Sequence, residues 1–431
     1  MHTRLALSLS LVLLGCGDDD GGSGTTTTMG TTGATTAPSS SNTSDDTDPT
    51  TTTGTTEDPT TSGSATETSG TAGTGMTTGE TSGTTDDSTT TGTTGGEIEP
   101  AYTCPPGLDP CPAFPGASWD VRDPAQLGLD AGVLDNFAAA TGGGRGCVFR
   151  YGYAATCWGN PAEGFEWASA SKTVWSTFLL FAVAEGRLAD VDALIADWDW
   201  PLAPEDQTMT FRHLANQVSG YALPEAPGAA WGYNDFAIKL YARTLFERVF
   251  AGEGDPNQVA ANPGRFGPLT FEDGPFFTMI KGAPRVGTSP RDFARFGWLW
   301  ANYGRWGETS LIPASLIQMA LEPGVPGNLP RTAGGAANDY LNVGTAGGGV
   351  DQTPLGPGVY AFNWWLNPGG ATWPSAPEDT FQANGHWNGE VLTVIPSLGI
   401  VAAWKGKSGD DANFNVAMDG LLGTLVAAVI E

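Results

Sequence analysis

Basic residues are scarce in this sequence. Its 431 residues include 19 Lys and Arg against 47 Asp and Glu, which gives a formal net charge of −28. Neither basic residue occurs between Gly17 and Asp120, so the acidic side chains of that stretch are unbalanced and supply about half of the net charge. Nucleic-acid binding needs basic patches, so we expect no nucleic-acid partner.

Residues 17–99 also lack aromatic side chains and consist almost wholly of Thr, Gly, Ser and Asp. A segment of this composition buries too little apolar surface to offset the entropy of ordering it. We therefore predict a disordered, charge-extended linker over residues 16–100. All 15 Trp lie beyond it, and residues 101–431 are numerous enough for one large domain or two intertwined subdomains.

The N-terminus has no apolar run long enough to span a bilayer. A short one, from Leu5 to Leu14, follows Arg4 and ends at Gly15 and Cys16. This end resembles the bacterial lipobox, which implies a signal peptide over residues 1–15 and a lipid on Cys16. The alternative is an ordinary signal peptide with a coincidental Cys. We expect an exported bacterial lipoprotein, facing the periplasm or at the cell surface, with the linker as its tether.

Four further cysteines follow the linker. An even number in an exported protein indicates two disulfides. Cys147 and Cys157 flank a plausible hairpin turn and could face each other across two strands, and Cys104 and Cys111 would then close a small loop rich in Pro and Gly.

Histidine is rarer still, with only His2, His213 and His386, and the sequence has no Cys-x-x-Cys pair. A metal site is therefore weakly supported, and we expect no metal and no organic cofactor. The sequence has no Gly-x-Ser-x-Gly motif. A Ser–His–Asp triad would have to use His213 or His386, whose flanking sequences give it no support. We interpret His213 as structural.

Apolar periodicity and turn residues predict strands near both ends of the domain and helices between them. We expect one antiparallel sheet flanked by helices, an α/β (α+β) fold, with the middle inserted as a helical lobe, a loop over 323–358, and a cleft between the two lobes. The expected helices are 129–140 with Asp130 as a cap, 171–185, 210–217, 235–251, 290–303 and 413–430, and the expected strands are 147–150, 154–158, 390–396 and 399–405.

Ser169 and Lys172 lie at the start of a long, strongly apolar predicted helix. Residues three apart on a helix share a face, so the hydroxyl and the ammonium can meet. A serine becomes a nucleophile when a base takes its proton, and lysine can be that base when burial favours its neutral form. A helix N-terminus also offers N–H groups to an oxyanion. We interpret Ser171, on a different face, as a capping or packing residue.

Six segments in this order resemble motifs of the serine β-lactamase and penicillin-binding-protein superfamily, and the closest branch is the class C β-lactamase-related hydrolases and esterases. The segments are residues 165–173, 211–214, 218–221, 231–235, 289–297 and 385–389. The resemblance covers residues 115–431 and implies the β-lactamase/transpeptidase-like fold.

The resemblance implies that Ser169 attacks the substrate carbonyl and forms an acyl-enzyme, that Lys172 accepts or shares its proton, and that Tyr233 acts with Lys172 and returns a proton to the leaving group. Asp235 stands where the family usually has Asn, a position that the resemblance assigns to binding the substrate amide. The alternative for Asp235 is a role as the cap of the following helix.

The third motif, at residues 385–389, places His386 where the family has Lys or His, and Asn388 where it has Gly. The resemblance implies that His386 binds a substrate carbonyl or carboxylate, and that the N–H groups of Ser169 and of a residue near Gly389 form an oxyanion hole. The alternative for His386 is a structural residue at a strand end.

Four tryptophans near the motifs either line an acyl-binding wall or belong to the core: Trp231, Trp364, Trp365 and Trp387. We expect a monomeric serine hydrolase that acts on a small-molecule ester or amide. Within enzymes, the alternative is a β-lactamase or D,D-peptidase. Outside enzymes, it is a catalytically silent surface lipoprotein that uses the same fold for binding.

Overall fold

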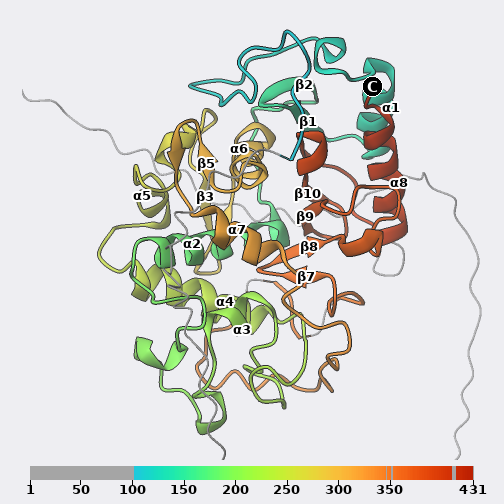
Figure 1. Ribbon diagram of the computed structural model, residues 1–431. Helices are drawn as coiled ribbons and strands as arrows, with labels where there is room; N and C mark the ends of the chain where they lie inside the picture. Colours follow the sequence, from blue (N-terminus) through green and yellow to red (C-terminus); the bar gives the residue numbers. More distant parts are fainter. Residues whose placement is uncertain (1–100, 346, 351–352, 410–413, 431) are drawn as a thin grey trace, which may run out of the picture. The chain divides into compact units, whose positions relative to one another are not determined.

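The computed structural model describes residues 101–345, 347–350, 353–409 and 414–430 (Figure 1). The predicted signal peptide, Cys16 and the linker lie outside the described residues, as does the first residue of the helix predicted at 413–430.

A seven-stranded antiparallel sheet forms the centre of the domain, in the order β2-β1-β11-β10-β9-β8-β7. The hairpin from the start of the domain thus joins the strands from its end through the pairing of β1 with β11, as the sequence predicted. Separate hairpins are formed by β3 with β4 and by β5 with β6. The strands are β1 (Arg145–Arg150), β2 (Tyr153–Trp158), β3 (Phe277–Ile280), β4 (Ala283–Val286), β5 (Arg305–Trp306), β6 (Thr309–Ser310), β7 (Tyr360–Ala361), β8 (Trp364–Leu366), β9 (Phe381–Gly385), β10 (Glu390–Ile395) and β11 (Ile400–Lys405).

Both predicted disulfides are confirmed. Cys147 and Cys157 are directly opposite each other in the β1–β2 register and are bonded. Cys104 and Cys111 are bonded within the segment that precedes the sheet.

Helices cover both faces of the sheet (Figure 1). Helix α6 packs closely on one face, where a Cβ on Gly297 would lie within 3.0 Å of Val401 and Leu392 side chains. Helix α8 lies beside α1 and reaches the other face of the sheet. There the side-chain amide of Gln382 in β9 donates a hydrogen bond to Met418 Sδ of α8 at 3.1 Å. The α-helices are α1 (Ala131–Ala140), α2 (Lys172–Ala184), α3 (Phe211–Ala215), α4 (Asp235–Thr244), α5 (Pro256–Ala260), α6 (Pro290–Ala301), α7 (Ala314–Leu321) and α8 (Phe414–Ala427).

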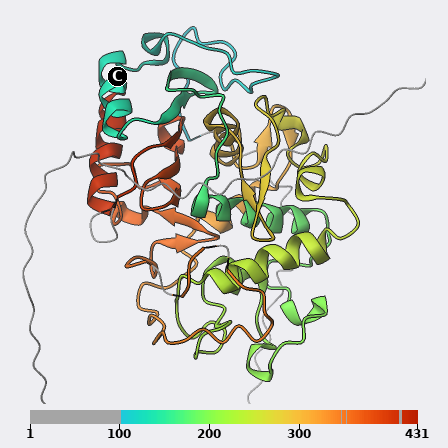
Figure 2. The same cartoon turned by 180° about the vertical axis from the view of Figure 1, so that it is seen from behind.

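The middle of the chain forms the predicted helical lobe, whose green and yellow elements gather away from the red C-terminal helix in the view from behind (Figure 2). Its central helix is α2, in which 11 of 13 residues are buried. Burial on every side of α2 explains its apolar sequence. It also means that Lys172, at its first position, is taken out of water.

Polar side chains start several of these helices by accepting backbone N–H groups. Asp130 accepts from Val133 at the start of α1, as predicted. The predicted helix 235–251 is observed as far as Val249, but it is α-helical only to Thr244 and continues as a π-helical turn, η5 (Leu245–Val249). Across its described residues, the segment 323–358 contains no helix and no strand, as expected. No helix in the described parts of the chain is long and apolar enough to cross a membrane.

Candidate active site

Ser169 lies in a tight 3-10 turn, η2 (Ala168–Ser171), which leads directly into α2. Ala168 has a left-handed backbone with φ 46°, which is strained for a residue with a side chain. The turn is anchored by its neighbours: Arg285 donates to the Ala168 carbonyl at 2.9 Å, and Ser171 Oγ accepts the N–H of Val286 at 2.9 Å. Ser171 is thus a packing residue that attaches the turn to strand β4.

Lys172 links the three predicted catalytic groups. Its Nζ lies 2.8 Å from Ser169 Oγ and 2.8 Å from the hydroxyl oxygen of Tyr233. It also forms an ion pair at 2.9 Å with Asp235, and the two side chains are only 2% and 6% exposed. The predicted meeting of Ser169, Lys172 and Tyr233 is therefore present in the structure.

The sequence suggested that Asp235 caps helix α4, but the structure gives this role to another residue. The cap is Asn234, whose Oδ1 accepts the N–H groups of Phe236 and Ala237. Asp235 is the first helical residue, and its carboxylate is directed to Lys172. It does not line the cavity at Ser169. Burial alone would raise the pKa of Asp235, but the Lys172 ammonium and the N–H of Gly348 hold it below its ordinary value.

The third predicted motif is a turn between two strands. Strand β9 ends at Gly385 and β10 begins at Glu390. Three consecutive residues between them, His386, Trp387 and Asn388, have positive φ values of 41°, 53° and 75°. Such strain persists only where surrounding contacts fix it, and it is concentrated at functional sites.

Asn384 fixes this turn through a reciprocal pair of hydrogen bonds. Its Oδ1 accepts the N–H of Asn388 at 2.9 Å, and its Nδ2 donates to Asn388 Oδ1 at 2.7 Å. The predicted roles of Asn388 and Gly389 at the substrate receive no support from the lining of the cavity. Neither lines the cavity at Ser169, since the Asn388 side chain is occupied by Asn384 and the Gly389 N–H is donated to the Gly385 carbonyl at 2.9 Å.

His386 does line the cavity, as predicted, although its side chain is 63% exposed. Its Nδ1 lies 2.9 Å from Glu390, which also receives Lys405 at 3.0 Å. The hydrogen bond with Glu390 raises the pKa of His386, against the opposing effect of its partial burial. His386 is the one imidazole among the described residues that line the cavity.

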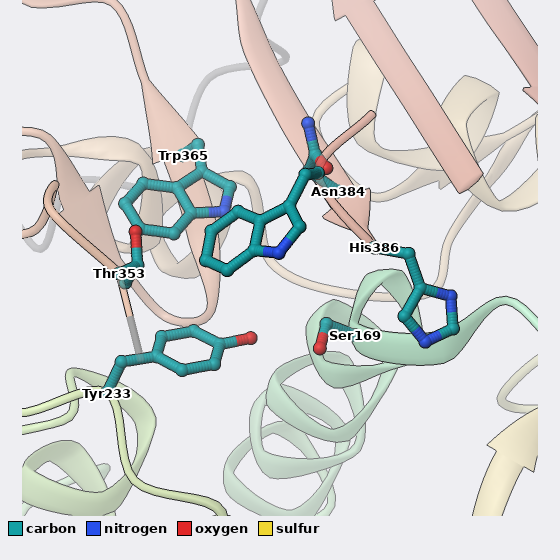
Figure 3. A pocket seen from close by; sticks show the side chains of 7 residues that line it. Ser169, Tyr233, Thr353, Trp365, Asn384 and His386 are labelled. Carbon is teal, nitrogen blue, oxygen red and sulfur yellow. The ribbon is translucent and has the colours of Figure 1, made fainter. Parts of the chain in front are cut away.

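The cavity at Ser169 has a volume of about 120 Å³. Figure 3 shows the Tyr233 hydroxyl pointing toward Ser169, with Trp365 and Thr353 beside Tyr233 and His386 on the other side of the serine. Trp365 and Tyr233 stack with ring centroids 6.2 Å apart. The lining residues are Ser169, Tyr233, Thr353, Trp365, Asn384, His386 and Trp387.

Of the four tryptophans considered, Trp365 and Trp387 line the cavity, whereas Trp231 and Trp364 are fully buried core residues. The sequence reasoning missed Asn384 and Thr353. Asn384 directly precedes Gly385, where a Cβ would lie 2.9 Å from the Trp167 carbonyl oxygen. That close approach is the reason for glycine at this position, and an Asn–Gly pair at a strand end was the available signal.

His213 lies away from the cavity and is structural, as predicted. It forms a reciprocal cap with Thr210 at the start of α3. Burial lowers the pKa of His213, although Asp192 opposes the shift.

Chemically, the site combines a hydroxyl, a buried lysine and a phenol within one hydrogen-bonded group, at the wall of an aromatic cavity. A lysine beside a serine hydroxyl is an arrangement that can activate a serine as a nucleophile. Its side chains come from three parts of the fold: Ser169 and Lys172 from the η2–α2 junction, Tyr233 from the segment before α4, and His386 from the β9–β10 turn.

The chain is only weakly similar to solved structures. No curated protein matches the chain. One similar solved structure is a beta-lactamase from Mycobacterium bovis, with 18% identity and a TM-score of 0.48, and the match covers 69% of this chain and 100% of that one. Another is a penicillin-binding protein homolog from Caulobacter crescentus, with 17% identity and a TM-score of 0.47, and the match covers 72% of this chain and 99% of that one. A family VIII carboxylesterase is similar at the same level, with 15% identity and a TM-score of 0.49, and the match covers 71% of this chain and 98% of that one. Similarity of this degree carries no argument about substrate.

The family comparison is more direct, because the model of the Beta-lactamase family matches residues 113–412, well over half of the chain. That span contains the sheet strands, the η2 turn and the β9–β10 turn. The fold predicted from the sequence is confirmed, and the chain belongs to the beta-lactamase family.

Proposed function

We propose that this protein is a serine hydrolase that cleaves small, uncharged carboxylic esters or amides through an acyl-enzyme on Ser169. The observation that carries the proposal is the contact of Lys172 Nζ with Ser169 Oγ and the Tyr233 oxygen, both at 2.8 Å, at the wall of a cavity. Membership of a hydrolase family supports it.

In the first step, Ser169 Oγ bonds to the carbonyl carbon while its proton passes to the Lys172–Tyr233 pair, and the carbonyl π electrons move to oxygen. Backbone N–H groups at Ser169 and at His386, two residues that line the cavity, are the proposed donors to this oxyanion. The bond to the leaving group then breaks, and the leaving group takes the proton. Water repeats the sequence in reverse, which frees the acid and restores Ser169.

The charges around the cavity support an uncharged substrate. β-Lactams and D,D-peptides carry a carboxylate that needs a cation. Among the described residues that line the cavity, only His386 can be cationic, and Glu390 already pairs with it at 2.9 Å. Lys172 is buried and paired with Asp235. A substrate carboxylate would therefore lose its hydration without an unshared partner in return.

The size of the cavity supports a short acyl group. Drug-sized ligands occupy pockets of about 300–1,000 Å³, whereas this cavity measures about 120 Å³. Trp365 and Trp387 provide its apolar surface. We expect acetyl and propionyl groups to fit and long acyl chains to be excluded.

The test is a comparison of p-nitrophenyl acetate, p-nitrophenyl octanoate and the cephalosporin nitrocefin as substrates. We expect the acetate to be hydrolysed fastest and nitrocefin to be poor. The variant Ser169→Ala should abolish turnover, whereas Ser397→Ala, at an exposed turn, should leave it unchanged. Preferred hydrolysis of nitrocefin would favour a β-lactamase instead, and a complete lack of turnover would favour a non-catalytic binding protein.

We also propose that the protein is anchored through lipid on Cys16, on the sequence evidence of the lipobox alone. Expression in a bacterial host with labelled palmitate should label the wild type and not Cys16→Ser. Equal recovery of both proteins in the soluble fraction, without label, would contradict the anchor.

A further inference from the structure

The cavity at Ser169 contains one hydroxyl that the proposed reaction does not use. Among the described residues that line the cavity, hydroxyls belong to Ser169, Tyr233 and Thr353. The first two are the proposed reacting groups. Thr353 lies beside the rings of Tyr233 and Trp365 (Figure 3), and only 5% of its surface is exposed.

The Thr353 hydroxyl has a proton to donate. Its Oγ1 accepts the N–H of Leu355 at 3.4 Å, and among the described residues nothing accepts its own proton. Asn384, the side-chain amide in the same wall, is different because both Nδ2 protons are used, on Gln382 Oε1 at 2.8 Å and on Asn388 Oδ1 at 2.7 Å. A hydroxyl combines one donor with two acceptor positions. Thr353 can therefore offer its O–H to a molecule in the cavity.

Arg331 holds the backbone that carries this hydroxyl. Its guanidinium donates to the carbonyl of Thr353, and to the carbonyl of Pro354 at 3.0 Å. The same guanidinium lies over the ring of Trp231, 4.9 Å from the ring centroid. A cation over an aromatic face is attracted by the negative potential of the ring. The Arg331 side chain therefore joins the backbone at Thr353 to the core of the protein.

Trp231 gives this arrangement a fixed base. It is fully buried, and its backbone pairs with both neighbours of Arg331: its N–H donates to the Pro330 carbonyl at 2.9 Å, and its carbonyl accepts the N–H of Thr332 at 2.7 Å. A Cβ on Gly356 would lie 2.5 Å from the Trp231 ring, so only glycine lets the backbone approach the indole this closely. The loop that carries the hydroxyl is therefore fixed to the core at two places.

The acyl group is the part of an ester that meets Thr353. A cavity of about 120 Å³ is too small for an aromatic leaving group together with an acyl chain. We therefore place the acyl chain inside it, attached to Ser169, and the leaving group toward solvent. An oxygen atom on that chain can accept the Thr353 proton, whereas a methylene group in its place leaves a buried donor unpaired.

We propose that Thr353 is a specificity-determining residue that favours short acyl groups carrying an acceptor oxygen, and that Arg331 is the residue that positions it. The inference rests on the proposed function and names the substrate class within it. The preferred acyl groups are then uncharged but polar, such as alkoxyacetyl groups, and hydrocarbon chains of the same length are poorer.

The test compares p-nitrophenyl methoxyacetate with p-nitrophenyl butyrate, two esters of equal length in which an ether oxygen replaces one methylene group. The quantity measured is kcat/KM for the methoxyacetate divided by kcat/KM for the butyrate. The ether oxygen also makes the carbonyl intrinsically more reactive, but this effect cancels when the ratio of a variant is compared with that of the wild type. Thr353→Val keeps the shape and removes the hydroxyl, and we expect it to lower the ratio roughly tenfold.

Two other threonine variants complete this comparison. Thr353→Ser retains the hydroxyl and should keep the ratio near its wild-type value. Thr309→Val makes the same change at an exposed position of β6, outside the cavity, and should leave the ratio unchanged. An unchanged ratio in Thr353→Val, or an equal fall in Thr309→Val, would overturn the inference. Should Thr353→Val fail to fold, Thr353→Ala tests the same ratio.

Arg331→Ala tests the positioning role. It should lower the ratio in the wild-type background and have no further effect on the ratio in Thr353→Val, where no hydroxyl remains to be positioned. Arg331→Lys, which can still donate to the carbonyls, should recover part of the ratio. A merely structural role would lower kcat/KM for both esters alike and leave their ratio unchanged, and that result would overturn the assignment of Arg331.

Hydrolysis of the two esters by the wild type, and its loss in Ser169→Ala, is the separate check on the proposed function. If the wild type hydrolyses neither ester, the proposed function is refuted, together with the inference that rests on it. Hydrolysis of both esters with an unchanged ratio in Thr353→Val would refute the inference alone.

Discussion

Replacing Gly385 with Ala is the most informative test of how the fold positions Ser169. Gly385 is the last residue of β9, and a Cβ there would lie 2.9 Å from the Trp167 carbonyl oxygen and 3.0 Å from the Ala168 Cβ. Ordinary contacts begin at 3.4 Å. Both neighbours belong to the strained turn that precedes Ser169, so β9 and this turn must separate by roughly 0.5 Å, a displacement at the limit that a catalytic site tolerates.

Because a 1 Å displacement of reacting groups can cost about a hundredfold in rate, we expect kcat/KM for p-nitrophenyl acetate to fall about tenfold. Overpacking should lower the free energy of unfolding by about 1–3 kcal/mol. The matched control is Gly420→Ala in α8, where an added Cβ meets nothing within 4 Å. It should keep full activity and gain slightly in stability. Full activity of a folded Gly385→Ala variant would refute the close contact between β9 and the Ser169 turn.

Two further predictions concern ion pairs that do not include Ser169 or Lys172. Arg265 is fully buried and bonded to Glu185 at 2.6 Å and to Glu253 at 2.7 Å. Both carboxylates are partly exposed and keep Arg187 as a partner, so Arg265→Ala should lower the free energy of unfolding in urea by about 1–3 kcal/mol. A loss below about 0.5 kcal/mol would contradict this role. The hydrogen bond with Glu390 raises the pKa of His386, so protonated His386 stabilises the folded protein. This contribution to the free energy of unfolding is fully present below the unfolded pKa of about 6.5, and it is lost as the pH rises through the folded pKa. Glu390→Gln should therefore destabilise the protein more near pH ~6 than near pH ~9, and should move the NMR titration of His386 to lower pH; a titration that does not move would show that the pair is absent in solution.

The parts of the fold with strong local signals could be predicted from the sequence. Asp130 before an apolar period fixed the start of α1, and the paired cysteines fixed the register of the β1–β2 hairpin. The spacing of Ser169 and Lys172 led to the nucleophile because helical geometry brings residues three apart together.

Features set by tertiary contacts could not be predicted in this way. Strands β7 and β8 have only two and three residues, too few for a period to show. The cavity residue Thr353 lies in a long loop whose path depends on packing. Asn388 and Gly389 were expected at the cavity because the sequence could not show that β9 ends at Gly385. The three left-handed residues that follow are fixed by the contact between Asn384 and Asn388 and not by local backbone preference.

The pair of Asp235 and Lys172 shows the same limit. The sequence marked Asp235 as a departure from the family and suggested a cap, because an acidic residue before a helix commonly has that role. The structure gives the cap to Asn234, and it brings Asp235 to a lysine 63 residues earlier in the chain, at 2.9 Å. Only the packing of α4 against α2 could reveal this contact.

The central claim is that Ser169 carries the acyl group, and the most direct measurement is the mass of the protein quenched in acid during turnover of p-nitrophenyl acetate, followed by peptide mapping. We predict an added acetyl group on the peptide that contains Ser169, and none in Ser169→Ala. An acetyl group on another residue, or turnover by Ser169→Ala at the wild-type rate, would contradict the account.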